Sequence, residues 1–406
     1  MQPVETVELK DWMTGSAVTA VLAALAAGGA EARFVGGCVR DSLASRPIRD
    51  IDIATPARPE RVVELIEAAG LKAVPTGLDH GTVTAVAEHQ PFEITSLRED
   101  IETDGRRAKV AFTDDWEADA ARRDFTFNAL SLAPDGRLYD PFEGRVDLTA
   151  GRVRFVGDPV ARIREDYLRI LRFFRFQAHY GREEPDRETL EAIRAEAAGI
   201  DGLSGERLRV EMLKLLAAAD PYPALAAMRD SGALARVLPQ ADLTALACLL
   251  GLEPRPDPLL RLAALLPADE AALRATAQRL RLSNAERDRL LTLSAPGLAL
   301  TLKSSREDLR LGAYRLGRES LEDILLLSAA RTAAEGADLK EALTRLGGWT
   351  APRFPLQGRD LLELGCEPGP ALGRTLKALE DWWIAEDYAP DREACLEEAK
   401  RRLSRR

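Results

Sequence analysis

The pattern of apolar and polar positions divides the chain into two regions. Up to about residue 150, short runs with a period of two and many β-branched residues alternate with turns and short helical stretches. The runs that predict strands are 33–36, 49–53, 82–87, 92–97 and 137–140. From about residue 160 onward the pattern is helical almost throughout, and Gly or Pro punctuates it. The sequence therefore predicts an α+β protein, with a small mixed α/β head followed by an all-helical remainder.

The composition is that of an ordinary globular protein. Of 406 residues, 46% are hydrophobic and 30% are charged. No apolar run reaches the ~18 residues that indicate a membrane span, and Glu5 and Glu8 argue against a secretory leader. Four widely separated cysteines form no CxxC pair, which favours a reducing, cytoplasmic location without a zinc site. Because the chain has only three histidines, a metal site would use carboxylates and a hard cation such as magnesium.

Charge is distributed unevenly along the chain. The net charge of −10 by itself argues against a nucleic-acid partner. Residues 151–182, however, carry eight arginines and only three acidic residues, a local net charge of +5 without any lysine. Arginine is suited to forked recognition of phosphates and base edges. This segment is therefore the candidate surface for a nucleotide or a nucleic acid.

A glycine pair and two aspartates form the first candidate site. Gly36 and Gly37 follow a predicted strand and precede a predicted helix, where free backbone N–H groups can approach a phosphate. Twelve residues separate them from Asp50 and Asp52, whose carboxylates are expected to leave one face of a strand. Two neighbouring carboxylates repel each other unless a divalent cation lies between them, as in a two-metal nucleotidyl transfer site. A tight turn and an exposed strand face are the structural alternatives.

This combination resembles the polymerase β nucleotidyltransferase superfamily, and within it the class II tRNA nucleotidyltransferases and bacterial poly(A) polymerases. The resemblance implies that Asp50 and Asp52 bind Mg²⁺ and that Gly37 and Arg40 lie at the nucleoside triphosphate. It also implies a third catalytic carboxylate on a neighbouring strand, for which Glu93 is the candidate. An ordinary surface position on a strand is the alternative for that residue.

The block Arg122-Arg123-Asp124-Phe125-Thr126-Phe127-Asn128-Ala129 resembles the second motif of the same family. By this match Arg123 would hold phosphate, and Asp124 would accept a ribose hydroxyl and so favour NTP over dNTP. Asn128 would belong to the same nucleotide-binding site. From the residues alone, the start of an amphipathic helix with a salt bridge is also possible.

A third block begins at Glu165. Asp166, Arg169, Arg172 and Arg175 recur every three residues, so on one helix they would form a slowly winding stripe. Such a stripe is usually a solvated face, but this one resembles the family's base-selecting motif Glu-Asp-x-x-Arg-x-x-Arg. Asp166 can only accept and Arg169 can only donate hydrogen bonds. The pair therefore matches the amino group and bare ring nitrogen that cytosine and adenine share, and opposes the reversed edges of guanine and uracil.

Together the three motifs imply a template-independent enzyme that adds CCA to tRNA 3′ ends from CTP and ATP by a two-magnesium mechanism. The resemblance covers residues 33 to about 215 well and the remainder loosely. Within the branch, residues 76–83 are more similar to CCA-adding enzymes than to poly(A) polymerases. A poly(A) polymerase, a CC-only or A-only enzyme, and a non-catalytic RNA-binding helical protein are the alternatives.

Four parts are expected along the chain. Residues 1–150 would form the catalytic head and 151–215 the helical neck that selects the base and binds RNA. Residues 216–300 would form a helical body and 301–406 a helical tail that binds tRNA. In the tail, a Gly-rich loop at 365–373 resembles a family segment that contacts the RNA backbone.

Overall fold

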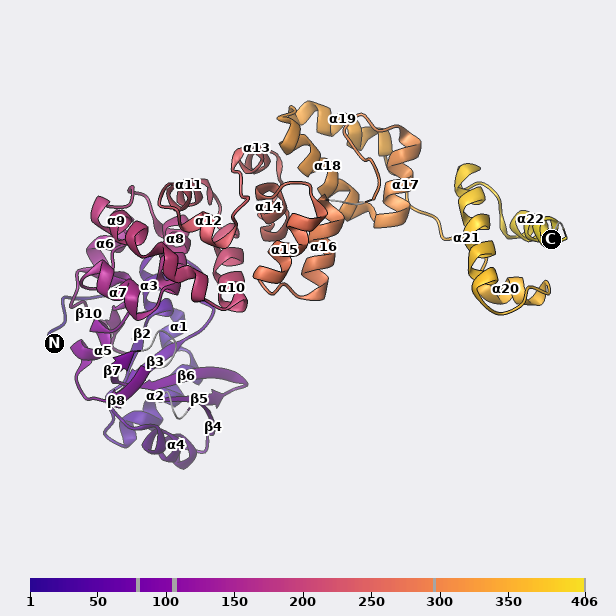
Figure 1. Cartoon of the computed structure of the whole chain (residues 1–406). Coiled ribbons are helices and arrows are strands. Elements are labelled where there is room, and N and C mark those ends of the chain that lie inside the picture. The colour runs from indigo at the N-terminus through magenta and orange to yellow at the C-terminus, as the bar shows by residue number, and fades with distance from the viewer. Residues whose placement is uncertain (78–80, 104–107, 295–296, 405–406) are drawn as a thin grey trace. The chain divides into compact units, whose positions relative to one another are not determined.

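An eight-stranded mixed sheet forms the centre of the head (Figure 1). The computed structural model describes residues 1–77, 81–103, 108–294 and 297–404. The strands lie in the order β1-β10-β9-β2-β3-β6-β5-β4. Their bounds are β1 (Glu5–Thr6), β2 (Arg33–Val35), β3 (Asp52–Thr55), β4 (Lys72–Gly77), β5 (Thr82–Ala87), β6 (Gln90–Ser96), β9 (Ser131–Leu132) and β10 (Arg137–Tyr139). A separate hairpin consists of β7 (Arg98–Thr103) and β8 (Ala108–Phe112).

The alternation of side chains along β3 decides which of them share a face of the sheet with Asp52. Ile53 is fully buried, as is Ile94 beside it on the parallel strand β6. Side chains alternate between the two faces of a sheet, so Asp52 points to the same side as Ala54, which packs with Val35, Leu97 and Trp116.

The helices of the head are α1 (Asp11–Thr14), α2 (Ser16–Ala27), α3 (Gly37–Leu43), α4 (Pro59–Ala68), α5 (Trp116–Ala121), the 3₁₀ turn η2 (Thr126–Asn128) and α6 (Gly144–Ala150).

A cluster of aromatic rings joins the head to the first long helix of the neck. The neck and the helices after it are α7 (Pro159–Glu165), α8 (Leu168–Tyr180), α9 (Arg187–Glu196), η3 (Ala197–Gly202), α10 (Gly205–Leu216), α11 (Tyr222–Asp230) and α12 (Ala233–Val237). Phe125 and Phe127 of the head lie 5.2 and 5.4 Å from the ring of Phe176 on α8, both edge to face. Phe125 also contacts Phe155 and Phe173. Burial of these rings fixes α8 against the head.

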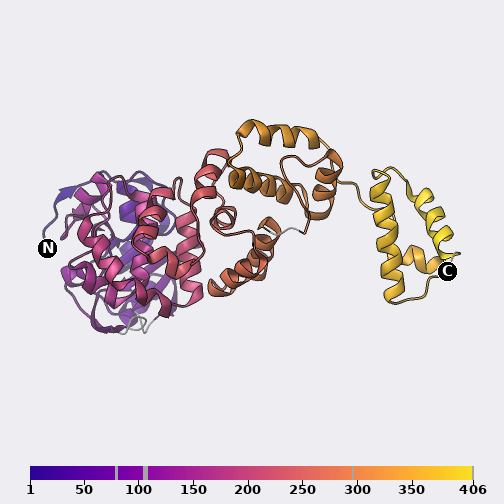
Figure 2. The ribbon, with the colours of Figure 1, turned by 45° about the horizontal axis from the view of Figure 1, so that its top comes forward.

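The remaining helices form a second compact unit. Residues 1–241 with 278–282 make up one unit, and residues 242–277 with 283–406 make up the other. Figure 2 shows that the described secondary structure of this second unit is entirely helical. Its helices are α13 (Thr244–Leu252), α14 (Pro258–Leu265), α15 (Glu270–Arg279, ending within 278–282), α16 (Asn284–Ser294), α17 (Arg306–Leu316), α18 (Arg318–Thr332), α19 (Gly336–Leu346), α20 (Gly358–Glu363), α21 (Pro370–Ala385) and α22 (Arg392–Leu403). No helix in the described ranges has the length and apolar character needed to cross a membrane.

The predicted fold class, an α+β chain with a mixed head and an all-helical remainder, is confirmed. The four-part division remains a prediction. Of the Gly-rich segment 365–373 in the tail, residues 365–369 precede α21, whereas residues 370–373 already belong to that helix. Of the segment 76–83, residues 78–80 lie outside the described residues, whereas Thr82 and Val83 begin β5.

The strand predicted over 49–53 was misplaced at its start. β3 begins only at Asp52, and Asp50 lies in the loop before it. On one side the partner strand β2 ends at Val35, and the chain turns away at Gly36. Residues ahead of Asp52 therefore have no partner on β2, and the pairing of β3 with β6 also begins at Asp52, opposite Glu93.

The helical stripe predicted to begin at Asp166 was wrong at that residue. Helix α7 ends at Glu165 and α8 begins at Leu168, while Asp166 is extended with φ −158° and ψ 106°. Its Oδ1 accepts a hydrogen bond from the backbone N–H of Leu168 at 3.1 Å. Aspartate competes with the helical backbone in this way and so favours a helix boundary.

A buried ion pair in the second unit generates a stability prediction. Arg261 is 1% exposed, and its Nε lies 2.7 Å from Oε1 of Glu253. Arg261→Ala leaves that carboxylate buried without its counter-charge, so the unfolding free energy should fall by about 3–5 kcal/mol. Arg274→Ala, which removes an exposed pair with Glu270, should change it by less than about 1 kcal/mol. Urea unfolding followed by circular dichroism measures both, and equal effects would contradict the prediction.

Candidate active site

One cleft brings together twelve of the thirteen residues that the sequence singled out. It has a volume of about 1080 Å³ and lies between the head and α8 and α10. Its lining includes Gly36, Gly37, Arg40, Asp50, Asp52, Arg123, Asp124, Asn128, Asp166, Arg169, Arg172 and Arg175. Glu93 is not part of this lining, but it lies beside Asp52 in the parallel register of β3 and β6.

A close backbone approach occurs at Gly36, where β2 ends and α3 begins. Gly36 has φ +69° and ψ −127°, a conformation that favours glycine. A Cβ at this position would lie 3.3 Å from Nη1 of Arg123 and 3.9 Å from Oδ2 of Asp52. The absence of a side chain therefore keeps open the space between a cation, a carboxylate and the start of α3.

The carboxylates around Asp52 carry more negative charge than their surroundings balance. The pKa of Asp52 is raised from 3.8 to about 6, chiefly by burial and also by Glu93 and Asp50, against the opposing effect of Arg123. A bound divalent cation would remove this repulsion, so the chemistry of the site fits Mg²⁺. Within the described residues, three or more His, Cys, Asp or Glu side chains do not gather into a ready-made metal site. The fit therefore rests on Asp50 and Asp52, with Glu93 contributing charge from the neighbouring strand.

Asp119, which the sequence analysis did not single out, holds both arginines of the second motif. Its Oδ1 lies 2.8 Å from Arg122 and its Oδ2 lies 3.1 Å from Arg123. Burial alone would raise the pKa of Asp119, but Arg123 and Arg122 lower it. The signal was present in the sequence, because Asp119, on α5, precedes the two arginines by three and four residues.

Asp124 is a buried link between the head and α8. Its Oδ1 accepts hydrogen bonds from the Phe125 N–H at 2.9 Å and from Asn128 Nδ2 at 2.8 Å. Its Oδ2 pairs with the guanidinium of Arg172, whose Nε lies at 2.7 Å. Burial would raise the pKa of Asp124, but Arg172 and Asn128 hold it below its usual range. A ribose hydroxyl would therefore have to share an oxygen that is already engaged.

The polar network continues from Asn128 to α3. Arg40 Nη1 donates to Asn128 Oδ1 at 2.7 Å, and the same guanidinium makes two 3.0 Å contacts with Asp41. The hydroxyl of Tyr180 donates to Asp41 at 2.5 Å. The helix that follows the glycine pair and the helix that carries the arginines are thus connected through named hydrogen bonds.

Asp166 and Arg169 both line the cleft, but each is held by its own partners. Asp166 Oδ2 lies 2.6 Å from Nη2 of Arg207. Arg169 pairs with Glu165 and donates to the carbonyl oxygens of Arg162 at 3.0 Å and Arg122 at 3.3 Å. The two side chains are therefore oriented before any nucleotide is present.

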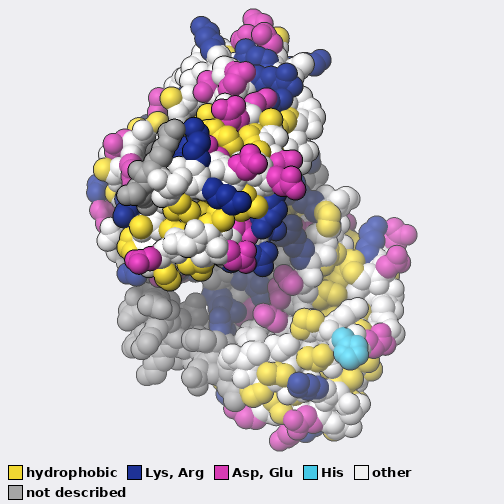
Figure 3. All heavy atoms as spheres, turned by 90° about the vertical axis from the view of Figure 1, so that its right-hand side faces the viewer, with side chains coloured by type: hydrophobic (Ala, Val, Ile, Leu, Met, Phe, Trp, Pro, Cys, Tyr) yellow, Lys and Arg dark blue, Asp and Glu magenta, His cyan; other side chains and the backbone are white. Residues whose placement is uncertain are grey.

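The arginine-rich segment is less positive in the fold than in the sequence. Seven of its eight arginines lie within 4.0 Å of a carboxylate, in the pairs Arg152–Asp147, Arg154–Asp147, Arg162–Glu165, Arg164–Glu196, Arg169–Glu165, Arg172–Asp124 and Arg175–Glu211. Most of these acids come from other segments. Figure 3 draws one face of the molecule, on which basic and acidic side chains are interspersed. Most of the positive charge of residues 151–182 is therefore balanced in the fold, and the candidate nucleotide surface predicted for this segment is represented in the cleft by Arg169, Arg172 and Arg175.

Other cations of the cleft come from positions that the sequence analysis passed over. Arg46, Arg49 and Lys214 line it, and in the described part of the chain no carboxylate lies within 4.0 Å of any of them. The Arg46 guanidinium lies 4.2 Å from the ring centre of Tyr180. Arg46 and Arg49 lie between the glycine pair and Asp50, whereas Lys214 comes from α10 and only the fold brings it to the same cleft.

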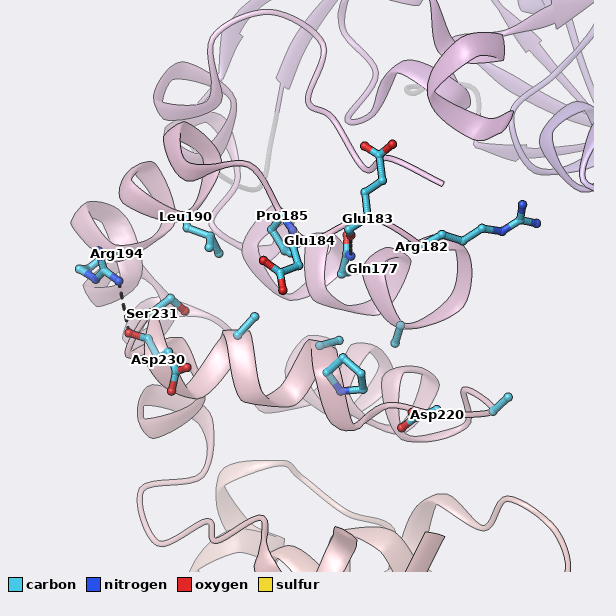
Figure 4. A pocket seen from close by; sticks show the side chains of 16 residues that line it. Gln177, Arg182, Glu183, Glu184, Pro185, Leu190, Arg194, Asp220, Asp230 and Ser231 are labelled. Carbon is cyan, nitrogen blue, oxygen red and sulfur yellow. Dashed lines mark hydrogen bonds between the residues drawn. The ribbon is translucent and has the colours of Figure 1, made fainter. Parts of the chain in front are cut away.

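A second cavity, of about 720 Å³, lies among α8, α9 and α11 (Figure 4). Figure 4 shows Pro185 and Leu190 near its centre, with Glu184 beside them and Arg194 hydrogen-bonded to the backbone of Asp230. None of the residues singled out by the sequence lines it.

Comparisons with known proteins identify the family and fold of the chain. The family described as "Poly A polymerase head domain" matches residues 32–154, and "Probable RNA and SrmB- binding site of polymerase A" matches residues 184–244. The chain is 37% identical to "CCA tRNA nucleotidyltransferase 1, mitochondrial" of Danio rerio, over 90% of this chain and 86% of that relative. It is 32% identical to a "CCA-adding enzyme" of Limosilactobacillus fermentum, over 93% and 95% of the two chains. The crystal structure of the Bacillus stearothermophilus CCA-adding enzyme in complex with CTP is similar with a TM-score of 0.76 and 27% identity, over 95% and 97% of the chains.

The titration of Asp52 generates a pH prediction for the metal-free protein. Its folded pKa of about 6 exceeds its ordinary value of 3.8, so the folded state binds this proton more tightly. The stabilisation is complete below about pH 4 and is lost as the pH rises through 6. The melting temperature in EDTA should therefore fall more between pH 5 and 7 in the wild type than in Asp52→Asn.

The matching measurement adds Mg²⁺ at pH 7.5. Magnesium should restore the melting temperature of the wild type and leave that of Asp52→Asn unchanged. Asp135→Asn, at an exposed turn of the head, serves as the control and should follow the wild type. Coincident pH profiles of the wild type and Asp52→Asn would refute the electrostatic account.

Proposed function

Since this chain belongs to the family of CCA-adding tRNA nucleotidyltransferases, we propose that it adds CCA to tRNA 3′ ends from CTP and ATP without a nucleic-acid template. The observation that carries the proposal is the single cleft in which Asp50 and Asp52 lie together with the arginines of α8. Such a cleft offers one place for a metal-bound triphosphate and another for a base edge. Similarity over nine-tenths of the chain to CCA-adding relatives favours this function over poly(A) synthesis.

The reaction requires an oxygen nucleophile, a triphosphate and a charged leaving group. The 3′ hydroxyl oxygen of the RNA forms a bond to the α-phosphorus of CTP or ATP. The bond from that phosphorus to the oxygen bridging to the β-phosphorus breaks, and pyrophosphate leaves. Magnesium ions held by Asp50 and Asp52 would lower the pKa of the attacking hydroxyl and neutralise charge on the leaving group.

The side chains around the glycine pair orient the triphosphate. Gly36 and Gly37 let phosphate oxygens approach the first N–H groups of α3. Arg40 and Arg123 donate to those oxygens, and each is already aimed by a carboxylate, Asp41 in one case and Asp119 in the other. Arginines held in this way lose little conformational freedom when the nucleotide binds.

Asp166 and Arg169 select the base. Cytosine and adenine each present an amino donor beside a bare ring nitrogen, so the carboxylate of Asp166 accepts and the guanidinium of Arg169 donates. Guanine and uracil place a carbonyl and a ring N–H in the reversed positions. Opposed groups in a closed site lose both hydrogen bonds, which disfavours the wrong base by several kcal/mol.

We also propose a cytoplasmic location. All four cysteines are free thiols, as is usual in a reducing compartment. The animal relatives carry "mitochondrial" in their names, and cell fractionation with an antibody to this chain distinguishes the two locations.

The function is tested by incubating the protein with tRNA that lacks its 3′ CCA. CTP and ATP together should restore the CCA end, CTP alone should add two residues, and ATP alone should add none. Long tails from ATP alone would indicate a poly(A) polymerase, and products that stop after CC or begin with A would indicate the partial enzymes. Binding without extension would indicate a non-catalytic RNA-binding protein.

The metal site predicts the effect of removing either aspartate. Asp50→Ala and Asp52→Ala should each reduce incorporation far more than tenfold, a loss above ~1.4 kcal/mol of transition-state stabilisation. The far-ultraviolet circular dichroism spectrum and tRNA binding should remain close to wild type, because no core contact is removed. Asp135→Ala is the matched control. A variant at 50 or 52 that keeps more than about a tenth of the wild-type rate would refute the two-metal assignment.

The proposed reading of the base by Asp166 and Arg169 predicts that substituting Asp166 changes nucleotide selectivity. Asp166→Ala should lower the rates with CTP and ATP together and allow detectable incorporation of UTP or GTP, since the acceptor that discriminates is gone. Exchanging Asp166 and Arg169 should not restore CTP incorporation, because the edge is then inverted. Single-nucleotide incorporation with each of the four NTPs measures this. Strict C-then-A addition at the normal rate by Asp166→Ala would place base selection elsewhere.

A further inference from the structure

Asp166 is held by side-chain contacts rather than by a helix. It occupies the break between α7 and α8, where no i→i−4 hydrogen bond of a continuous helix fixes its backbone. Oδ1 is bound to the Leu168 N–H at 3.1 Å. One hydrogen bond from the next turn leaves the carboxylate free to rotate about its own axis, so a second contact is needed to fix its plane.

Arg207 provides that second contact from a different helix. Its Nη2 lies 2.6 Å from Oδ2 of Asp166, although the two residues are 41 positions apart. Both side chains line the cleft and are largely covered, at 30% and 25% exposure. Each carboxylate oxygen has two lone pairs. One on each oxygen is engaged, and the other remains available for a base.

The helix that carries Arg207 is itself closely seated. One turn further along α10, the buried Glu211 lies 3.1 Å from Arg175 and 3.9 Å from Arg172 on α8. At the start of α10, a Cβ on Gly205 would lie 2.4 Å from the Arg279 carbonyl oxygen, so only a glycine permits this approach. Arg207 therefore projects from a fixed support.

The residue after Asp166 is clamped in the same region. A Cβ on Gly199 of η3 would lie 2.1 Å from Cδ1 of Tyr167, so the tyrosine ring rests directly on the backbone of η3. Tyr167 and Arg207 thus restrain the break between α7 and α8 from two sides. The restraint acts at the one base-reading side chain that lies outside a helix.

We propose that Arg207 is a positioning residue that sets base selectivity by fixing the plane of the Asp166 carboxylate. The proposal rests on the proposed function, in which Asp166 reads the base. Arg207 needs no contact with the nucleotide, since its effect passes through Asp166. Arg207 orients Asp166 as Glu165 orients Arg169. The two side chains that read the base are therefore oriented by separate partners.

Arg207→Ala should raise incorporation of UTP or GTP relative to CTP by about tenfold or more, because a rotating carboxylate no longer opposes the wrong edge. The KM for tRNA should change less than twofold. Arg207→Lys keeps a donor without the fork and should recover part of the discrimination. Arg236→Ala, which removes an exposed pair with Asp201 outside the cleft, should leave the four NTP rates unchanged.

A double-mutant cycle separates positioning from direct contact. In an Asp166→Ala background, Arg207→Ala should have no further effect on the ratio of wrong to right nucleotides, since there is no carboxylate left to orient. If Arg207 instead binds a phosphate, its removal weakens all four NTPs equally and does so in either background. That result, or an unchanged ratio in the single variant, overturns the proposal.

Wild-type protein assayed in parallel distinguishes a failure of the proposed function from a failure of the positioning role of Arg207. Absence of CTP and ATP incorporation by the wild type is a failure of the proposed function. Normal CCA addition together with an Arg207→Ala variant that keeps full discrimination is a failure of the positioning role alone. Circular dichroism of Arg207→Ala and Arg207→Lys verifies that both variants are folded, and a folded lysine variant tests the proposal even where the alanine variant unfolds.

Discussion

The buried ion pair between Asp124 and Arg172 is the interaction on which the geometry of the cleft depends. A carboxylate taken out of water is unfavourable unless a cation accompanies it, so this part of the head is stable only with α8 against it. The aromatic rings of Phe125 and Phe176 pack around the same junction. The separation between the end of the cleft that carries Asp50 and Asp52 and the end that carries Asp166 and Arg169 is consequently a property of the folded unit, to which this pair, 48 residues apart in the chain, contributes.

Two different balances of charge follow from this arrangement. Around Asp52 carboxylates are in excess, which its raised pKa reports, and a divalent cation is the natural complement. Along α8 the sequence has an excess of arginines over acidic residues. In the fold this excess is balanced, because the arginines of α8 have acidic partners. A paired arginine loses long-range attraction but gains a fixed direction, and direction is what discrimination between base edges requires.

The sequence predicted those features that depend on local pattern. Period-two runs located β5 and β6, and the glycine pair with two aspartates located the carboxylate end of the cleft. Asp119 was missed although its spacing from Arg122 and Arg123 is local, whereas other missed features depend on distant partners. The start of β3 coincides with the end of its pairing to β2, the break at Asp166 is accompanied by its bond to Arg207, and the neutralisation of Arg175 is due to Glu211 on α10. No spacing rule connects these positions, since the fold alone makes them neighbours.

A chain with a net charge of −10 can bind RNA because attraction and recognition are assigned to different cations. Arg46, Arg49 and Lys214 line the cleft without acidic partners in the described ranges, so their fields extend into solvent and can act on phosphates at a distance. The paired arginines contribute little to that field but hold their hydrogen-bond donors in place. The unpaired cations beside the cleft therefore supply an attraction that depends on charge alone. The arginines held by Asp124, Glu165 and Glu211 keep a fixed direction, which suits recognition of the pattern of hydrogen-bonding groups on a nucleotide.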